Sequence, residues 1–240
     1  MRSFSLVIPC FNESGNIKEL IKACHSIPNG QIEFIFVDNG STDETFAELN
    51  SESEILERAL VIKAEKNLGY GGGIKLGLSR AKGTFLGWTH ADLQTNPRDL
   101  IQIIEWIQLN DNLALDTFYK GKRYGRPLSD KIFTFGMSLF ESCIFLTNLN
   151  DINAQPTFFA RLFYEKYIHS SPDDFSLDLY FYVMEKKDNL NIQRFPVNFG
   201  ARSFGNSSWN TGILSKFSFI KRTISFSINL KLSFWKHDHN

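Results

Sequence analysis

The stretch FLGWTHADLQTNP, residues 85–97, joins the end of an apolar run to a series of evenly spaced polar side chains. The apolar residues at its start predict a buried strand, and its closing Asn-Pro pair predicts the first turn of a helix. Between them, His90, Asp92 and Gln94 occupy alternate positions and would share one face. Because ligands bind at the carboxyl ends of strands in open α/β sheets, this stretch predicts a binding site at the end of its strand.

Apolar runs of the same kind recur before it along the chain. Near-continuous Val, Ile, Phe and Leu predict strands that are covered on both faces. The four runs lie at residues 5–11, 32–38, 59–65 and 84–90. Helical patterns follow them, from Ile17 to Ile27, after residue 42, over 73–81 and after Asn96. This alternation predicts an α/β fold with a Rossmann-like, mostly parallel central sheet and helices on both faces.

The second half of the chain is less regular. It predicts a buried or interfacial helix over 131–149, a strand that turns into a helix over 157–163, an amphipathic helix over 176–187 and a last strand over 191–197. No internal repeat or low-complexity linker divides it. We expect one domain over residues 1–212, followed by a separate C-terminal segment over 213–240.

The composition excludes some partners and compartments. Lys plus Arg and Asp plus Glu each number 26 in 240 residues, so no overall charge favours nucleic acid. The three cysteines, Cys10, Cys24 and Cys143, show no disulfide or metal-binding pattern, which indicates a reducing compartment. Because the start lacks a signal-peptide pattern and no uncharged apolar run reaches about 18 residues, we expect a cytoplasmic protein without a transmembrane helix.

Polar side chains collect where each of the four predicted strands ends. Any one of them could be an ordinary helix cap or turn residue, because Asn, Asp and Gly are common there. Four successive strand ends of this kind favour a shared site. The residues are Asn12 and Glu13, then Asp38, Asn39 and Asp43, then Lys66 and Asn67, and finally His90, Asp92 and Gln94.

The glycine-rich run GYGGG, residues 69–73, matches neither the dinucleotide-binding fingerprint nor the P-loop. Its glycines have two interpretations. They could form a tight strand-to-helix turn, or they could let a ligand approach the N-terminus of a helix.

Four motifs in order resemble glycosyltransferase family 2, and they cover residues 4–112. They read VIPCFNESGNI, FVDNGSTDET, NLGYGGGIKLGLSRAKG and ADLQTNP. The form of the last motif is similar to the branch that transfers sugars to dolichyl or polyprenyl phosphate. The resemblance implies a GT-A fold and a nucleotide-diphosphate sugar as donor. It also implies a nucleotide-sugar pocket formed by Pro9, Asn12, Glu13, Asp38, Asn67, Gly69, His90, Ala91 and Asp92, with Asp38 reading the base.

The same resemblance implies a divalent metal, Mn²⁺ or Mg²⁺, bound by Asp92 and Gln94. His90 departs from the family, which usually has Asp at that position. An imidazole is a poor ligand for Mg²⁺ and an acceptable one for Mn²⁺. His90 could therefore bind the metal, contact the donor, or form only a local hydrogen bond at the strand end.

The acceptor side is expected to depend on cations. By the resemblance, Arg123, Lys131 and Arg202 would bind the phosphate of a lipid acceptor, and Arg suits this task because it binds phosphate in a bidentate manner. Lys120 is expected to be a solvated surface lysine. Asp178 lies where relatives that glycosylate hydroxyl groups keep a general base.

The C-terminal segment is basic and aromatic. From residue 189 to the end there are seven basic residues and one acidic residue, a net charge of +6. Its apolar residues fit a helical face and strand alternation equally well. The segment could lie on an anionic membrane surface, or it could form a dimer contact or pack on the domain.

The residues and the resemblance together imply a metal-dependent, inverting glycosyltransferase that is peripheral at the cytoplasmic face of a membrane. Asp92, Asp178 and Arg202 are the candidate catalytic residues. The preferred acceptor is a polyprenyl phosphate. The alternatives are a sugar hydroxyl of a cell-surface glycan and a catalytically silent module that binds nucleotide sugars. A homo-oligomer is also possible.

Overall fold

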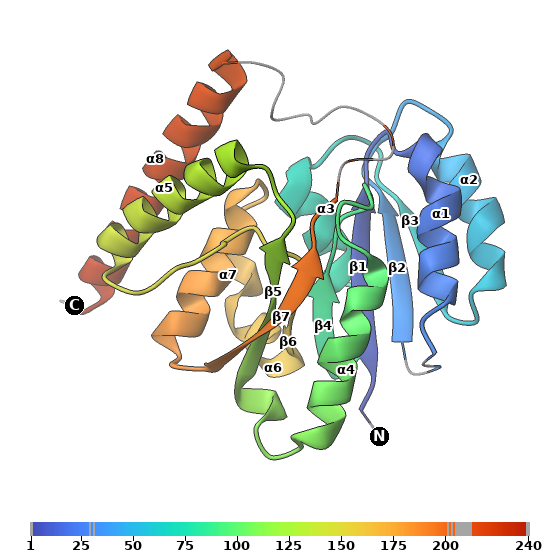
Figure 1. The fold of residues 1–240 in the computed structure, drawn as a ribbon, viewed down its shortest axis with the longest axis horizontal. Coiled ribbons are helices and arrows are strands. Elements are labelled where there is room, and N and C mark those ends of the chain that lie inside the picture. Colours follow the sequence, from blue (N-terminus) through green and yellow to red (C-terminus); the bar gives the residue numbers. More distant parts are fainter. Residues whose placement is uncertain are drawn as a thin grey trace. The chain divides into compact units, whose positions relative to one another are not determined.

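The computed structural model describes residues 2–28, 30, 32–200, 202, 204 and 213–238 (Figure 1). The chain divides into two compact units. The first comprises Met1–Arg126 and Asn153–Gly205 and contains a sheet, and the second comprises Pro127–Ile152 and Asn206–Asn240 and contains a pair of helices.

The first unit is built on a seven-stranded sheet with the order β3-β2-β1-β4-β6-β5-β7. Strands β1 to β4 pair in parallel, β5 and β7 are parallel to each other, and β6 is antiparallel to both β4 and β5. The predicted α/β class with a mostly parallel sheet is therefore confirmed. The strands span Phe4–Cys10 (β1), Ile32–Asp38 (β2), Ala59–Lys63 (β3), Phe85–Trp88 (β4), Thr117–Tyr124 (β5), Thr157–Ala160 (β6) and Asn191–Asn198 (β7).

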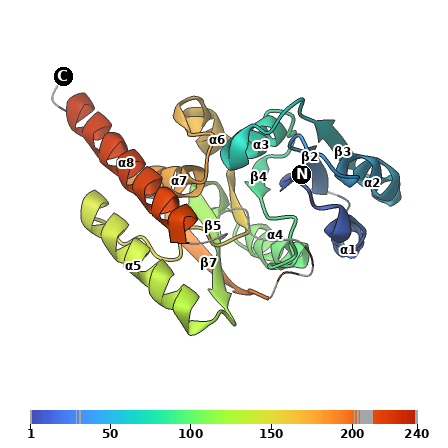
Figure 2. The ribbon, with the colours of Figure 1, turned by 90° about the horizontal axis from the view of Figure 1, so that it is seen from above.

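Helices of this unit cover both faces of the sheet (Figure 2). Helices α1 and α4 lie on one face, and α3, α6 and α7 lie on the other. The helices span Ser14–His25 (α1), Thr45–Glu52 (α2), Gly69–Leu78 (α3), Leu100–Leu109 (α4), Arg161–Tyr167 (α6) and Ser176–Lys187 (α7). Short 3₁₀ helices span Ser53–Ile55 (η1), Pro97–Asp99 (η2), Ala114–Asp116 (η3) and Ile168–Ser170 (η4).

Strand β1 is buried on both sides, which explains its near-continuous apolar sequence. Phe4, Leu6 and Ile8 belong to the core cluster that includes the apolar residues of α1 and α4. On the opposite face, Val7 meets α3 at Gly77, where a Cβ atom would lie only 2.4 Å from Val7 Cγ1. A glycine is required there because helix and strand approach so closely.

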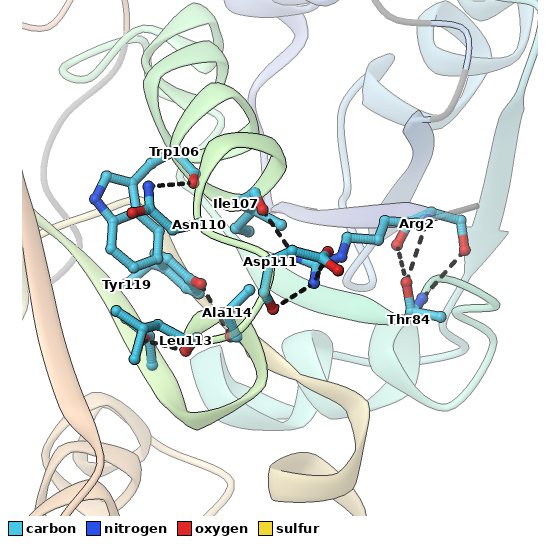
Figure 3. Close-up of polar contacts among 11 residues, drawn as sticks. Arg2, Thr84, Trp106, Ile107, Asn110, Asp111, Leu113, Ala114 and Tyr119 are labelled. Carbon is cyan, nitrogen blue, oxygen red and sulfur yellow. Dashed lines mark hydrogen bonds and ion pairs between the residues drawn. The ribbon is translucent and has the colours of Figure 1, made fainter.

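Polar contacts hold the edge at which β1 and β5 begin (Figure 3). Arg2 donates hydrogen bonds to the backbone oxygens of Ile107 and Asp111, each at 2.7 Å, and forms an ion pair with the Asp111 carboxylate. The Tyr119 hydroxyl donates to the backbone oxygen of Ala114 at 2.9 Å. These contacts link β1, α4 and β5 at the edge opposite to the strand ends predicted to bind a ligand.

Strand β5 was not predicted, and the expectation for Lys120 within it is wrong. Lys120 is 0% exposed, and its ammonium donates to Ala154 O at 3.0 Å and to Thr157 Oγ1 at 3.1 Å. A buried ammonium is tolerated only where such acceptors surround it. Its partners lie more than thirty residues away along the chain, so local sequence could not identify this lysine as part of an interior strand.

The second unit pairs α5 (Leu128–Phe145) with α8 (Ile213–Asp238). The C-terminal segment is thus a helix, and the alternative of a strand is not adopted. Phe145 of α5 lies 6.5 Å from Phe234 of α8, measured between ring centroids. Residues 127–152, which we expected in the same domain as the sheet, group with α8 in the second unit.

Within the described ranges, no helix combines the length and the apolar character that a membrane-spanning helix needs.

Candidate active site

The carboxyl ends of β1, β2 and β4 form the candidate site. β1 pairs with β2 on one side and with β4 on the other, and Cys10 at the end of β1 lies beside Asp38 at the end of β2. The polar residues after these strands therefore lie along one edge of the sheet.

Asp38 and Asn12 form the end of the site that lies over β1 and β2. Asp38 is 0% exposed, and its Oδ1 accepts from the Ser41 backbone N–H at 3.0 Å. Its Oδ2 is buried and has no hydrogen-bond partner in the described part of the chain. Asn12 has a φ of +55° and accepts from the Thr42 backbone N–H at 2.8 Å, which joins the two loops. The unpartnered Asp38 oxygen could accept an N–H group from a ligand.

Glu13 lies half-buried between the two loops, and its backbone N–H donates to Thr45 Oγ1 at 2.8 Å. Burial raises the pKa of Glu13; the hydrogen bond from Asn16 opposes this shift, and the charge of Asp92 adds to it. Pro9, also half-buried, lies in β1 beside Val37 of β2. These residues line the same edge as Asp38.

Asp92 and Gln94 converge on a single cation. Asp92 is 4% exposed, and its Oδ2 lies 2.8 Å from Nη2 of Arg202. Gln94 Oε1 accepts from Nε of the same guanidinium at 3.3 Å. The Gly200 backbone N–H donates to Gln94 O at 2.9 Å, which holds the segment after β7 against this loop. The Asp92 carboxylate and the Gln94 side-chain oxygen therefore both contact the Arg202 guanidinium.

These two oxygens fit a hard divalent cation, which prefers oxygen ligands. No group of three or more His, Cys, Asp or Glu side chains that could hold a metal occurs among the residues the structure describes. Asp92 and Gln94 could supply two ligands, and the remaining ligands would have to come from elsewhere. Ala91 between His90 and Asp92 is buried, at 3% exposure.

His90 is half-buried beside an aromatic side chain. Its ring centroid lies 5.6 Å from that of Tyr70. Burial lowers the pKa of His90, and Asp92 and Asp178 act in the opposite direction. The imidazole is therefore neutral near pH 7. It forms no hydrogen bond with any residue that the structure describes.

The glycine-rich run begins α3 and packs closely against the chain itself. A Cβ atom at Gly71 would lie 2.6 Å from the Pro172 backbone oxygen, and Gly72 N–H donates to Asp173 O at 2.9 Å. Lys75 of α3 pairs with the Asp173 carboxylate at 2.8 Å. These contacts favour the structural interpretation of GYGGG, because the segment before α7 occupies the space the glycines provide.

Asn67 and Gly69 stabilise that turn. Asn67 Oδ1 accepts from the Gly69 N–H at 2.8 Å, and Asn39 Nδ2 donates to Gly69 O at 2.9 Å. Gly69 has a φ of +80°, the left-handed region that glycine adopts most readily. The expected contact of Asn67 and Gly69 with a nucleotide sugar stays a prediction.

Asp178 lies in the first turn of α7 and is 2% exposed. Three side chains donate to its carboxylate: Tyr70 Oη to Oδ2 at 3.0 Å, and Gln155 Nε2 and Trp88 Nε1 to Oδ1 at 2.7 Å and 3.2 Å. None of these three donors was singled out as a site residue. Their convergence on Asp178 joins segments far apart along the chain, so it could not be found from the sequence.

The three candidate phosphate-binding cations fall in different units. Arg123 is half-buried in β5, and its guanidinium carbon lies 5.1 Å from the centroid of the Phe199 ring. Arg202 belongs to the same unit, at the Asp92 carboxylate. Lys131 is exposed on α5 of the second unit. The shared role of these residues stays a prediction.

Comparison with solved structures identifies the class of fold. Glucosyl-3-phosphoglycerate synthase from Mycobacterium tuberculosis, solved with Mn²⁺, uridine diphosphate and glucosyl-3-phosphoglycerate, matches with a TM-score of 0.64 at 18% identity. The match covers 96% of this chain and 80% of that one. The chain has the GT-A fold, as expected.

The family model for glycosyl transferase family 2 matches residues 5–167. The chain therefore belongs to glycosyl transferase family 2.

Two curated relatives are similar over part of their length. Dolichol-phosphate mannosyltransferase from Pyrococcus furiosus is 26% identical over 209 residues, which cover 85% of this chain and 58% of the relative. Dodecaprenyl-phosphate galacturonate synthase from Rhizobium johnstonii is 27% identical over 128 residues, which cover 50% of this chain and 37% of the relative. The chain thus spans less than two thirds of either relative.

Proposed function

We propose that this protein transfers a sugar from a nucleotide-diphosphate sugar to a polyprenyl phosphate, with inversion at the anomeric carbon. The choice of acceptor rests on the burial and hydrogen bonding of Asp178. This buried carboxylate, the candidate general base, already accepts three hydrogen bonds. A sugar hydroxyl needs a base to take its proton, whereas a phosphate monoester is already an anion near neutral pH. The site therefore suits a phosphate acceptor better.

The donor pocket is proposed at the ends of β1, β2 and β4. Asp38 would accept an N–H of the nucleobase with its unpartnered Oδ2, and Asn12 would hold the surrounding loops. Glu13, His90 and Asp92 would lie along the ribose and diphosphate. His90, being neutral, would donate a hydrogen bond to the donor without adding charge.

Asp92 and Gln94 would hold a divalent metal, with Arg202 moving away from them. When bound, the metal would stabilise negative charge on the departing nucleoside diphosphate. Solved structures of this fold contain Mn²⁺ or Mg²⁺, which supports a divalent cation. His90 in place of the usual carboxylate favours Mn²⁺ over Mg²⁺.

The acceptor would be held by cations. Arg123 and Arg202 would orient the phosphate so that one of its oxygens attacks the anomeric carbon on the side opposite the leaving nucleotide. A single displacement of this kind inverts the configuration. The names of both curated relatives refer to polyprenyl-phosphate sugar transfer, which supports this acceptor class.

The second unit is proposed to lie on the cytoplasmic surface of an anionic membrane. One side of α5 exposes large apolar residues at helical spacing, namely Leu128, Ile132, Phe135 and Leu139. Helix α8 exposes Ile228, Leu232 and Trp235, and it also carries Lys221, Arg222 and Lys231. Apolar side chains together with basic ones are typical of helices that bind anionic lipid surfaces.

Incubation of the purified chain with Mn²⁺ and a panel of uridine and guanosine diphosphate sugars tests the transfer. Three acceptors are compared: a polyprenyl phosphate, a soluble glycan and water. A glycosylated lipid phosphate is the expected product, identified by mass spectrometry. A product formed only on the glycan supports the hydroxyl acceptor, and donor binding without any product supports a silent binding module.

Sedimentation with anionic vesicles tests the membrane proposal. Binding should weaken as salt concentration rises, because it depends on charge. Changing Ile132 and Phe135 to Ser should release the protein from vesicles. Unchanged vesicle binding in that variant would exclude the α5 face from membrane contact. A dimer that the variant converts to a monomer would assign this face to contact between copies.

A further inference from the structure

The hydrogen-bond network around Asp178 joins parts of the first unit that are far apart in sequence. Its three donors come from the start of α3 (Tyr70), from β4 (Trp88) and from the loop two residues before β6 (Gln155). Gln155 Nε2 also lies 3.2 Å from the Tyr70 hydroxyl, and Gln155 is 0% exposed. The carboxylate of Asp178 thus links its own helix α7 to another helix, a strand and a loop.

One of these donors packs beside the His90 ring, and another precedes His90 in the chain. The Tyr70 ring stacks on Phe175 with a centroid distance of 4.6 Å and an interplanar angle of 9°, and it meets the His90 ring at 5.6 Å. Trp88 precedes His90 by two residues and is 0% exposed. The phenol beside the imidazole and the indole before it in the chain are therefore both held by Asp178.

The geometry of Asp178 does not suit a proton acceptor. A carboxylate offers about four lone-pair sites, and three donors occupy three of them here. Burial and the charge of Asp178 also raise the pKa of Tyr70 well above its usual value, so the phenol remains a donor. An acceptor hydroxyl would have to reach the one remaining site of a carboxylate that is only 2% exposed.

We propose that Asp178 is a positioning residue that acts through Tyr70 and Trp88 to hold the His90 imidazole at the edge of the donor pocket. The identification of that pocket rests on the proposed function. His90 forms no hydrogen bond with the described residues, so packing against Tyr70 is what keeps its ring in place. Its unoccupied nitrogens then face the donor in one fixed orientation.

The test changes Tyr70 to Phe, which removes the hydroxyl and keeps the ring. NMR of protein labelled at histidine reports the His90 imidazole, whose signal is assigned by its loss in His90→Asn. Tyr70→Phe and Asp178→Asn should both shift this signal. The matched control is Tyr167→Phe, because the Tyr167 hydroxyl donates to the Asp188 carboxylate at 2.6 Å just beyond the other end of α7. The control should leave the His90 signal unchanged.

Turnover gives a second measurement. Tyr70→Phe should lower kcat/KM for the donor about tenfold, the scale of one hydrogen bond to a charged group, and should keep the shape of the pH profile. An unchanged His90 signal in Tyr70→Phe would overturn the proposal. So would full activity of Tyr70→Phe combined with loss of one limb of the pH profile in Asp178→Asn, the behaviour of a general base.

The NMR measurement does not require turnover. If no acceptor is glycosylated but the His90 signal shifts as expected, the proposed function fails and the positioning role stands. If Asp178→Asn does not fold, Tyr70→Phe alone decides the result.

Discussion

The guanidinium of Arg202 lies 2.8 Å from the carboxylate of Asp92, and it also contacts the side-chain oxygen of Gln94 at 3.3 Å. The Arg202 guanidinium therefore contacts the same two oxygens that are proposed to bind the metal. The same arginine is proposed to bind the acceptor phosphate. Metal binding and release of Arg202 toward the acceptor would then be linked by simple competition for Asp92.

Removing this internal cation should increase metal affinity. Arg202→Gln is expected to bind Mn²⁺ about fivefold more tightly than the wild type, since a partly exposed ion pair contributes at most about 1 kcal/mol. Electron paramagnetic resonance of free Mn²⁺ measures this without donor or turnover. Arg2→Gln, which breaks an Arg–Asp pair at the opposite edge of the sheet, is the control. Equal Mn²⁺ affinity in all three proteins would exclude the competition.

Asp92→Asn should reduce turnover by roughly a hundredfold or more, because it removes the charged ligand that would hold the metal. The rate is measured with saturating donor and Mn²⁺, and circular dichroism checks the fold. Asp111→Asn changes an exposed carboxylate at the other end of the strands and should retain full activity. A near-normal rate in Asp92→Asn would remove this residue from the mechanism.

His90→Asp tests whether the imidazole binds the metal. If it does, wild-type activity should be higher with Mn²⁺ than with Mg²⁺, and the variant should shift toward Mg²⁺, which prefers oxygen ligands. The ratio of the two rates is the quantity to measure. The same ratio in wild type and variant would leave His90 as a donor contact and exclude it as a ligand.

Arg123→Ala should raise the KM for polyprenyl phosphate or lower turnover by about 10- to 100-fold, the scale of a charge-assisted hydrogen bond. The KM for the donor should change little. Lys122→Ala is the matched control, because Lys122 is the exposed preceding residue of β5. If both variants lose the same activity, general charge near the acceptor matters and a specific phosphate contact does not.

The second unit should lose stability as the pH rises. Burial raises the pKa of Glu141 in α5 from 4.5 to about 7, with the Ser227 hydroxyl opposing the shift. A raised pKa means that stability is complete below about pH 4.5 and is lost as the pH rises through about 7. The loss should amount to roughly 2–3 kcal/mol.

Hydrogen exchange in α5 and α8, corrected for intrinsic rates, measures this loss. Glu141→Gln should remove the decline in protection between pH 5 and pH 8. Asp130→Asn changes an exposed carboxylate of α5 and should keep it. A wild-type protein whose protection does not vary over this range would contradict the prediction.

Much of the architecture follows from local sequence. Both faces of β1, β2 and β4 are buried, so their apolar runs were evident, and the polar residues that follow them are where parallel strands bring ligand-binding groups together. The family motifs over the first half added the expected roles of Asp38, Asp92 and Gln94. Helix α7 was predicted with the bounds Ser176–Lys187 that the structure shows.

The sequence by itself determined the alternation of strands and helices from β1 to α4, and it determined which edge of the sheet carries the candidate site. Tertiary structure decided what depends on distant partners. Lys120 is interior because oxygens of residues 154 and 157 accept its protons, and Asp178 is occupied because Tyr70, Trp88 and Gln155 converge on it. Gly69, Gly71 and Gly72 lie against the chain before α7 because the fold packs that segment on the start of α3. The physical reason is that periodicity reports which side of an element is buried, whereas hydrogen bonding between segments depends on which elements the fold places side by side.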